Sequence, residues 1–235
     1  MDHLDLDRDT ITKAYARWAP VYDLVFGTVF ERGRAAAIAA AERVGGRILE
    51  VGVGTGISLP DYKRTTRLCG VDISAPMLEK AAERVRELGL TNVEGLFVMD
   101  AEKLEFPDAS FDVVMAQYVV TTVPNPEATL DEFARLLKPG GEIVLVSRVG
   151  AELGLRKSLE KWFAPAARKL GWRTEFPFER YTNWVERNST VHLIERRAVP
   201  PFGHFSLIRF GKSVGAGQLT PPRSALVEAG SKVGR

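Results

Sequence analysis

The sequence contains a single cysteine, Cys69, and no long apolar run. One cysteine cannot form an intramolecular disulfide, which favours a protein kept in a reducing cytoplasm. The longest apolar window without a charge, Val113–Pro126, is too short to cross a bilayer. Residues 1–7 are acidic and lack the basic-then-apolar order of a signal peptide. Cysteines and histidines do not recur at metal-ligand spacing, so we expect no metal site.

Length and composition favour one α/β domain with an addition at each end. The chain has 235 residues, enough for a sizeable core, and its apolar and charged fractions of 45% and 26% are ordinary for a globular protein. We expect an N-terminal amphipathic helical segment over residues 1–45, in which Pro20 separates two helical pieces. Residues 46–212 then form the main domain, with an insertion at about 150–189. Residues 213–235 have no apolar period and predict a flexible tail.

A glycine-rich turn directly after a mostly apolar segment is the most informative motif. Residues Arg47–Val51 predict a short buried strand that carries Glu50 near its end. Three glycines follow at every second position: Gly52, Gly54 and Gly56. Such a turn between a strand and a helix lets a nucleotide-type ligand lie against bare backbone. A dinucleotide fingerprint would need its third glycine where Ile57 stands, so a dehydrogenase is disfavoured.

Acidic residues end the two strands that are predicted next along the chain. Leu68–Asp72 predicts a strand ending in an acid that can accept hydrogen bonds from the hydroxyl groups of a ribose. Val93–Met99 predicts another strand, followed directly by Asp100. Further strands are predicted at Phe111–Gln117 and Glu142–Ser147, separated by a helix at Pro126–Leu137 and the breaker Lys138–Gly141. Strands alternating with helices indicate a mostly parallel sheet with helices on both faces.

The G-x-G-x-G turn, the ordered acids at strand ends and the later L-x-P-G-G run resemble those of class I S-adenosylmethionine-dependent methyltransferases. The resemblance implies a Rossmann-like α/β fold with a seven-stranded, mostly parallel sheet, an antiparallel last strand and an N-terminal helical cap. It also implies S-adenosyl-L-methionine as cofactor, S-adenosyl-L-homocysteine as product and no metal. The cofactor-binding residues that it implies are Tyr15, Tyr22, Glu50, Gly52, Gly54, Gly56, Asp72, Ile73, Met77, Asp100, Ala101 and Gln117.

Segments on both sides of these motifs narrow the resemblance. Ala16–Asp23 and Arg197–Phe210, with its Pro-Phe-Gly connection, resemble the bacterial soluble-type phosphatidylethanolamine N-methyltransferases, which are relatives of the quinone-ring C-methyltransferases. The resemblance implies N-methylation of phosphatidylethanolamine toward its monomethyl and dimethyl derivatives and phosphatidylcholine. Two alternatives stay open. One is C-methylation of a quinone precursor, and the other is a non-enzymatic adaptor that only binds S-adenosylmethionine.

The expected chemistry requires a site that tolerates a developing cation. A neutral lipid amine attacks the methyl carbon of the sulfonium, so positive charge moves from sulfur to nitrogen, and the pocket should offer oxygens and aromatic faces. A lipid phosphate favours an arginine as a bidentate donor. We predict Tyr22, Tyr118 and His192 as catalytic residues, and Tyr22, Tyr118, Arg148, Arg180 and Tyr181 as substrate-binding residues.

Apolar and basic residues indicate reversible binding to an anionic membrane surface. The apolar residues of 1–45 recur at intervals typical of a helix, and they include Trp18, Val25 and Phe26. Basic residues outnumber acidic ones over residues 148–235, whereas acidic residues dominate the rest of the chain. Bulky apolar side chains between these basic residues favour a membrane over nucleic acid. We therefore expect a monomeric cytoplasmic enzyme, with a phospholipid as its partner, that docks on the inner face of the cytoplasmic membrane.

Overall fold

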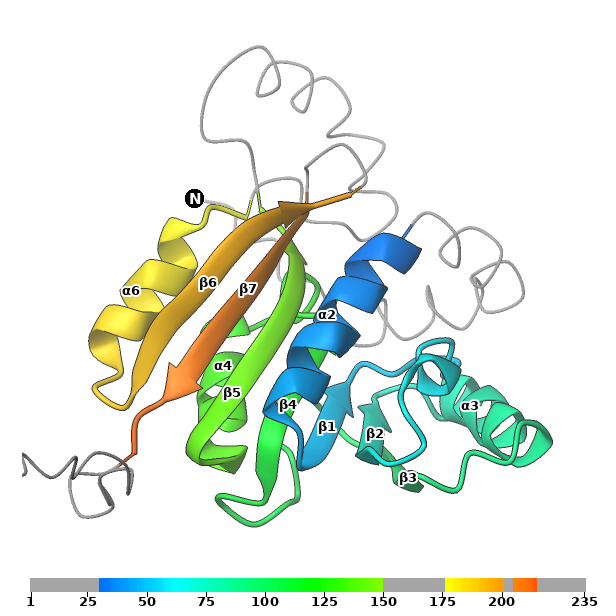
Figure 1. The fold of residues 1–235 in the computed structure, drawn as a ribbon. Coiled ribbons are helices and arrows are strands. Elements are labelled where there is room, and N and C mark those ends of the chain that lie inside the picture. Colours follow the sequence, from blue (N-terminus) through cyan, green and yellow to red (C-terminus); the bar gives the residue numbers. More distant parts are fainter. Residues whose placement is uncertain (1–29, 150–175, 201–204, 215–235) are drawn as a thin grey trace, which may run out of the picture.

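The computed structural model describes residues 30–149, 176–200 and 205–214, which build one twisted sheet flanked by helices (Figure 1). The sheet has seven strands in the order β3-β2-β1-β4-β5-β7-β6. Strands β1 to β5 pair in parallel, whereas β7 lies antiparallel to both β5 and β6. The predicted mostly parallel sheet with an antiparallel last strand is confirmed. The strands are β1 Arg47–Val51, β2 Arg67–Asp72, β3 Val93–Val98, β4 Phe111–Gln117, β5 Leu137–Arg148, β6 Val191–Val199 and β7 Phe205–Lys212.

Helices cover both faces of this sheet. The described helices are α2 Glu31–Val44, α3 Ala75–Glu87, α4 Pro126–Leu136 and α6 Glu179–Arg187, with a 3-10 helix at Leu59–Asp61. Buried residues of α2 and α3 join one hydrophobic cluster with residues of the strands. Residues of α4 and α6, among them Phe133 and Trp184, join a second cluster. The central strands are therefore buried on both faces, which explains the apolar runs Val113–Ala116 in β4 and Ile143–Val146 in β5.

Helix α2 is the described part of the segment 1–45, for which the sequence predicts a helical cap. The helix presents the small buried residues Ala37, Ala40 and Ala41, which let it pack closely on the sheet. It contacts β4, β5 and β7. Residues 31–44 therefore contribute directly to the core of the main domain.

The start of β5 is the main departure from the predicted boundaries. The sequence predicts a strand from Glu142 after a Pro-Gly-Gly breaker, but β5 begins at Leu137, directly after α4. Leu137 has extended backbone angles and pairs with Phe111. The register then shifts, so that Val113 faces Glu142. Gly140, with a φ of 81°, accommodates the extra residues, as glycine does in a bulge. The glycine run thus produces an irregularity within the strand.

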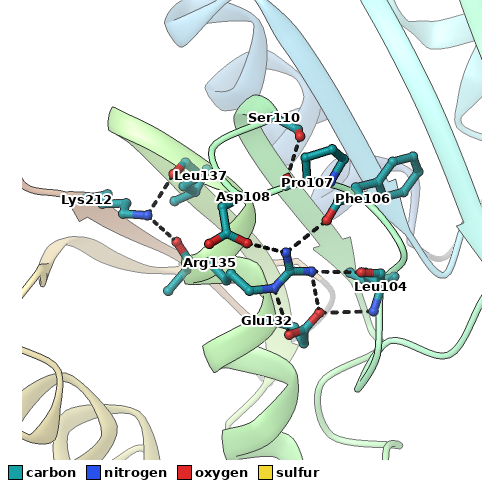
Figure 2. Close-up of polar contacts among 10 residues, drawn as sticks. Leu104, Phe106, Pro107, Asp108, Ser110, Glu132, Arg135, Leu137 and Lys212 are labelled. Atoms are coloured by element: carbon teal, nitrogen blue, oxygen red, sulfur yellow. Dashed lines mark hydrogen bonds and ion pairs between the residues drawn. The ribbon is translucent and has the colours of Figure 1, made fainter.

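Arg135 of α4 holds the loop between β3 and β4 (Figure 2). Its guanidinium donates to the backbone carbonyls of Leu104 and Phe106 at 2.8 and 2.9 Å and pairs with Asp108 at 2.6 Å. Glu132 accepts from Arg135 at 2.8 Å and from the backbone N–H of Leu104 at 3.0 Å. These contacts fix the chain just after Asp100, the acid that the sequence predicts at the end of strand β3.

Some predictions concern parts of the chain outside the described residues. These include Tyr15, Tyr22, the tail from residue 215 and most of the predicted insertion at 150–189. The described end of that insertion carries α6, whose Tyr181 and Trp184 are buried in the domain core. In the described ranges, no helix has the length and apolar character needed to cross a membrane. Within the same ranges, no group of histidine, cysteine and acidic residues is suited to hold a metal ion.

Candidate functional site

A pocket lies at the carboxyl ends of β1, β2 and β4, the sheet edge where ligands bind in folds of this architecture. Its lining comes from the turn after β1, the junction of β2 with α3, the residues after β3 and the loop after β4. The predicted residues that line it are Gly52, Gly54, Asp72, Ile73, Met77, Asp100, Ala101, Gln117 and Tyr118. The residues that sequence reasoning missed are Val51, Val71, Ser74, Met99, Val119, Thr122, Val123 and Pro124. Most of the predicted cofactor set is thus brought together in one cavity.

The glycine turn gives this pocket a wall of bare backbone. Gly52 and Gly54 have φ values of 74° and 56°, in the left-handed region that glycine adopts without strain. A Cβ on Gly52 would overlap Val119, whereas a Cβ on Gly54 would meet no atom within 4 Å. Gly56 has a different task, since it does not line the pocket and a Cβ there would press on Leu59 and Ala81. The first two glycines therefore shape the ligand side, and the third allows close packing on α3.

Asp72 joins the glycine turn to the start of α3. Its Oδ2 accepts a hydrogen bond from the backbone N–H of Gly54 at 2.9 Å, and its Oδ1 accepts one from Ser74 N–H at 2.9 Å. Burial raises the pKa of Asp72 above the usual aspartate value, while these backbone donors act in the opposite direction. The carboxylate therefore holds two walls of the pocket at a fixed separation.

Glu50 is buried and does not line the pocket. The side chain is 3% exposed, and its oxygens accept from Ser58 Oγ at 2.7 Å, Tyr62 Oη at 2.8 Å and Gln117 Nε2 at 3.1 Å. Burial raises its pKa to about 7, and the hydrogen bonds from these three donors limit the rise. The sequence predicts that Glu50 binds the cofactor directly, but the described structure places it behind the lining residue Gln117.

Two buried polar atoms of the pocket lining have no hydrogen-bond partner in the described structure, Ser74 Oγ and Gln117 Oε1. Ser74 is 1% exposed and stands at the N-cap of α3, yet its side chain makes no capping bond. A serine directly before a helix is usually interpreted as a cap, so the sequence gives no sign that this hydroxyl is free for a ligand. Because buried polar atoms are nearly always paired, these two atoms indicate where a ligand supplies partners.

Tyr118 lies at the junction between the pocket and the first turn of α2. It has a φ of 63°, a strained value for a residue with a side chain, and such strain concentrates at functional sites. Its ring contacts Phe30 and Phe205, with centroid distances of 4.6 and 5.2 Å. Its hydroxyl donates to the Phe30 carbonyl at 3.5 Å, and burial raises its pKa well above the usual tyrosine value. Tyr118 is therefore a neutral phenol in an aromatic group of three, whose other two members sequence reasoning missed.

The remaining predicted residues are not brought into this pocket. Arg180 forms an ion pair with Glu127 through two bonds of 2.8 and 2.6 Å. Tyr181 is buried and donates to Ser147 at 2.7 Å. His192 pairs with Gly211, which in turn pairs with Glu142, so it lies toward the opposite edge of the sheet. Arg148 ends β5 at the pocket edge of the sheet but does not line the pocket.

The pocket residues fit the parts of S-adenosylmethionine. Asp72 ends β2, where a carboxylate can accept hydrogen bonds from a ribose, and Asp100 follows the neighbouring strand β3, where the family resemblance implies an acceptor for the adenine amino group. Ile73 is 40% exposed and offers an apolar surface for a flat ring. Ser74 and Gln117 supply the unpaired polar atoms. A seven-stranded sheet of this topology with this site defines the class I methyltransferases.

Comparison with known proteins identifies the same class. A protein-family model described as a methyltransferase domain matches residues 49–145. The chain is 40% identical over 205 residues to a phosphatidylethanolamine N-methyltransferase of Cereibacter sphaeroides. The aligned region covers 87% of this chain and 98% of that protein. It is 31% identical over 136 residues to a ubiquinone/menaquinone biosynthesis C-methyltransferase of Pseudomonas savastanoi pv. phaseolicola. This aligned region covers 56% of this chain and 53% of that protein.

A solved structure supports the assignment of the fold. A chain from the complex between the Haloferax volcanii Trm112 methyltransferase activator and a methyltransferase superposes with a TM-score of 0.69 at 19% identity. The match covers 87% of this chain and 97% of that chain. The chain described here therefore belongs to the class I S-adenosylmethionine-dependent methyltransferases, and it is an enzyme of that family.

Proposed function

We propose that this protein transfers methyl groups from S-adenosylmethionine to the amine of phosphatidylethanolamine, toward its monomethyl and dimethyl derivatives and phosphatidylcholine. The observation that carries the proposal is the 40% identity to a phosphatidylethanolamine N-methyltransferase over 98% of that relative's length. The quinone methyltransferase relative, by contrast, matches over 53% of its length. Similarity over 87% of this chain extends beyond residues 49–145 into the flanking segments, to which we assign the selection of the substrate.

The pocket supports binding of the cofactor at one end and of an amine at the other. When bound, S-adenosylmethionine supplies an electrophilic methyl group on a sulfonium. Asp72 and Asp100 hold the adenosine end, where Ser74 offers a further hydroxyl. Across the sheet edge, the loop after β4 provides Val119 and Pro124 as an apolar wall. The methyl acceptor then lies between this wall and Tyr118.

Tyr118, which Phe30 and Phe205 hold in place, lines the pocket with an aromatic ring that suits a product carrying positive charge. Aromatic faces attract ammonium groups, and a phenol that stays neutral adds no repulsive or competing charge. The Tyr118 hydroxyl donates to Phe30, so we assign it a role in binding and none as a proton acceptor. Because the thioether leaves without a proton, the transfer needs no acid. The amine must bind in its neutral form or lose its proton to water.

The proposal includes a membrane-borne substrate, and we propose that a monomer docks reversibly on an anionic leaflet through the N-terminal segment. The apolar stripe of residues 1–29, with Trp18, Val25 and Phe26, supports this proposal, as do the basic residues of 148–235. This segment directly precedes Phe30, whose ring contacts Tyr118 beside the pocket. Docking through it would bring the lipid amine close to the site.

The proposal is tested with purified full-length protein, labelled S-adenosylmethionine and vesicles that contain phosphatidylethanolamine. Thin-layer chromatography should show label in methylated phosphatidylethanolamine and none in a demethylated quinone precursor offered in the same detergent. Label on the quinone ring would transfer the assignment to the C-methyltransferase alternative, which the Pseudomonas relative favours. Cofactor binding without label on either acceptor would contradict the proposed substrates. The Asp72→Ala variant serves as the control for cofactor-dependent transfer.

A further inference from the structure

The Glu50 carboxylate determines which way the Gln117 amide faces. Above its pKa of about 7 the carboxylate is ionised and only accepts hydrogen bonds, so the group that Gln117 turns toward it, at 3.1 Å, is then the NH2. Ser58 and Tyr62 donate to the same carboxylate and hold it in place. The Gln117 carbonyl oxygen is therefore the atom of the amide that Glu50 leaves for another partner, and Gln117 is itself a lining residue of the pocket.

That oxygen, Gln117 Oε1, is buried and has no hydrogen-bond partner in the described part of the chain. An unpaired buried acceptor in a pocket lining indicates that the ligand brings the donor. Strand order locates this donor on the ligand. Strand β4 lies beside β1, on the side away from β2 and β3, whose ends carry Asp72 and Asp100. An adenosine held by these two acids therefore directs the amino-acid end of the ligand toward Gln117.

The amino-acid end of the cofactor carries one group that suits this acceptor. S-adenosylmethionine has two cationic groups, but the sulfonium has no hydrogen to donate, whereas the α-ammonium has three. A carbonyl oxygen accepts a hydrogen bond from an ammonium. An amide NH2 in the same place could not, because both groups are donors. The orientation imposed by Glu50 is thus the one that a bound α-ammonium requires.

We propose that Gln117 Oε1 accepts a hydrogen bond from the α-ammonium of the cofactor, and that Glu50 is a positioning residue that selects this amide orientation without touching the cofactor. The proposal rests on the cofactor occupying the described pocket. Under this proposal Glu50, the acid before the glycine turn, affects cofactor binding only through the orientation of Gln117. Ser58 and Tyr62 become its supports, although neither lines the pocket.

Calorimetric titration with two probes at pH 8, where Glu50 is ionised, tests this proposal. One probe is S-adenosylhomocysteine, and the other is 5′-S-(3-carboxypropyl)-5′-thioadenosine, which lacks only the amino group. The wild-type protein should prefer the first probe about tenfold or more, the effect of one hydrogen bond to a charged group. Glu50→Gln preserves volume but adds a donor, so it should reduce the preference severalfold while binding of the second probe changes little. Glu50→Asp remains an acceptor only and should retain most of the preference.

Variants of Gln117 separate an indirect effect from a direct one. Gln117→Leu removes the acceptor and should abolish the preference between the probes. In that background, Glu50→Gln should change the preference no further, because Glu50 acts through Gln117. A further loss in the double variant would overturn the proposal in favour of direct contact. An unchanged preference in the folded Gln117→Leu variant would also overturn it. If the wild-type protein bound neither probe, the cofactor site itself would be overturned.

Discussion

Gly33 of α2 lies directly against the hydroxyl of Tyr118, so that a Cβ at position 33 would overlap the Tyr118 Oη. The Tyr118 ring cannot move away easily, because Phe30 and Phe205 contact it at centroid distances of 4.6 and 5.2 Å. The first turn of α2 and the start of the loop after β4 are therefore packed so closely that position 33 has no room for a side chain. A residue of the segment that precedes the glycine motif thus sets the position of a residue in the site.

Gly33→Ala should therefore lower methyl transfer without stabilising the helix. An alanine in a helix is ordinarily favoured over glycine by about 1 kcal/mol, but here the displaced Tyr118 side chain offsets the gain. The rate of transfer and urea unfolding measure the two effects. Ala35→Gly, at an exposed position of the same helix, is the matched control and should cost stability while sparing activity. A stabilised and fully active Gly33→Ala protein would contradict the fitted contact.

Asp72→Ala should weaken binding of S-adenosylmethionine and its demethylated product. The loss expected for hydrogen bonds to a charged acceptor is about 1.5–3 kcal/mol. The variant also releases the N–H groups of Gly54 and Ser74, so slightly lower thermal stability is expected as well. Calorimetry measures the affinity, with Glu87→Ala, an exposed acid of α3, as the control. Tight binding of NAD with none of S-adenosylmethionine would refute the assignment of the site.

Ser74→Ala should weaken the same ligands while leaving the free protein as stable as before. The Oγ is buried and unpaired, so its removal loses no internal hydrogen bond, but a ligand loses a partner worth about 1 kcal/mol. Ser58→Ala is the matched control, since this buried serine donates to Glu50 at 2.7 Å and its removal should destabilise the fold. Thermal unfolding with and without S-adenosylhomocysteine measures both effects. Equal destabilisation by the two substitutions would show that the Ser74 hydroxyl is structural.

Glu50 should make folding stability fall between acidic and neutral pH. Its pKa in the folded protein is about 7, above the ordinary glutamate value of 4.5, so the folded state binds the proton more tightly than the unfolded state does. Its favourable contribution is therefore complete below pH 4.5 and is lost as pH rises through 7. From pH 5 to 8, the loss should be about 2–3 kcal/mol.

Urea unfolding of the wild-type protein and Glu50→Gln at both pH values measures this contribution. The wild-type protein should lose stability relative to the variant as pH rises, because the variant has no proton to release at position 50. Other carboxylates have lowered pKa values, among them Glu127 and Glu132, and they titrate identically in both proteins. Parallel stability curves would mean that Glu50 keeps an ordinary pKa.

Deleting residues 1–19 should abolish co-sedimentation with anionic vesicles, and high salt should reduce binding of the full-length chain. Burial of Trp18, Val25 and Phe26 contributes roughly 1.5–3 kcal/mol each at best, before the cost of ordering the segment. Each basic residue held near the surface adds about 1 kcal/mol, which salt weakens. Zwitterionic vesicles are the control for the electrostatic part. Full sedimentation of the truncated protein would place the docking surface elsewhere.

The sequence by itself determined five strands of the sheet, whereas its seven strands and most of the predicted pocket residues came from the resemblance to the methyltransferases. Short-range periodicity predicted β1 and β4 at their observed bounds, and the spacing of Asp72 and Asp100 from the glycine turn identified two acids at adjacent strand ends. These features follow from local backbone rules. Parallel strands bring their carboxyl ends to one edge, so residues placed there by local spacing converge in the fold.

Only the tertiary structure decided which way individual side chains point. Glu50 shares the face of β1 that packs toward Tyr62 and Met115, because side chains alternate along a strand, and the packed helices determine which face meets the pocket. Arg180 pairs with Glu127, 53 residues away in sequence. Its guanidinium is therefore occupied by a carboxylate and is not presented to a lipid phosphate, the ligand that the sequence predicts for it. Such partners are set by elements distant along the chain. Local patterns place a residue at an edge, but packing decides what it touches.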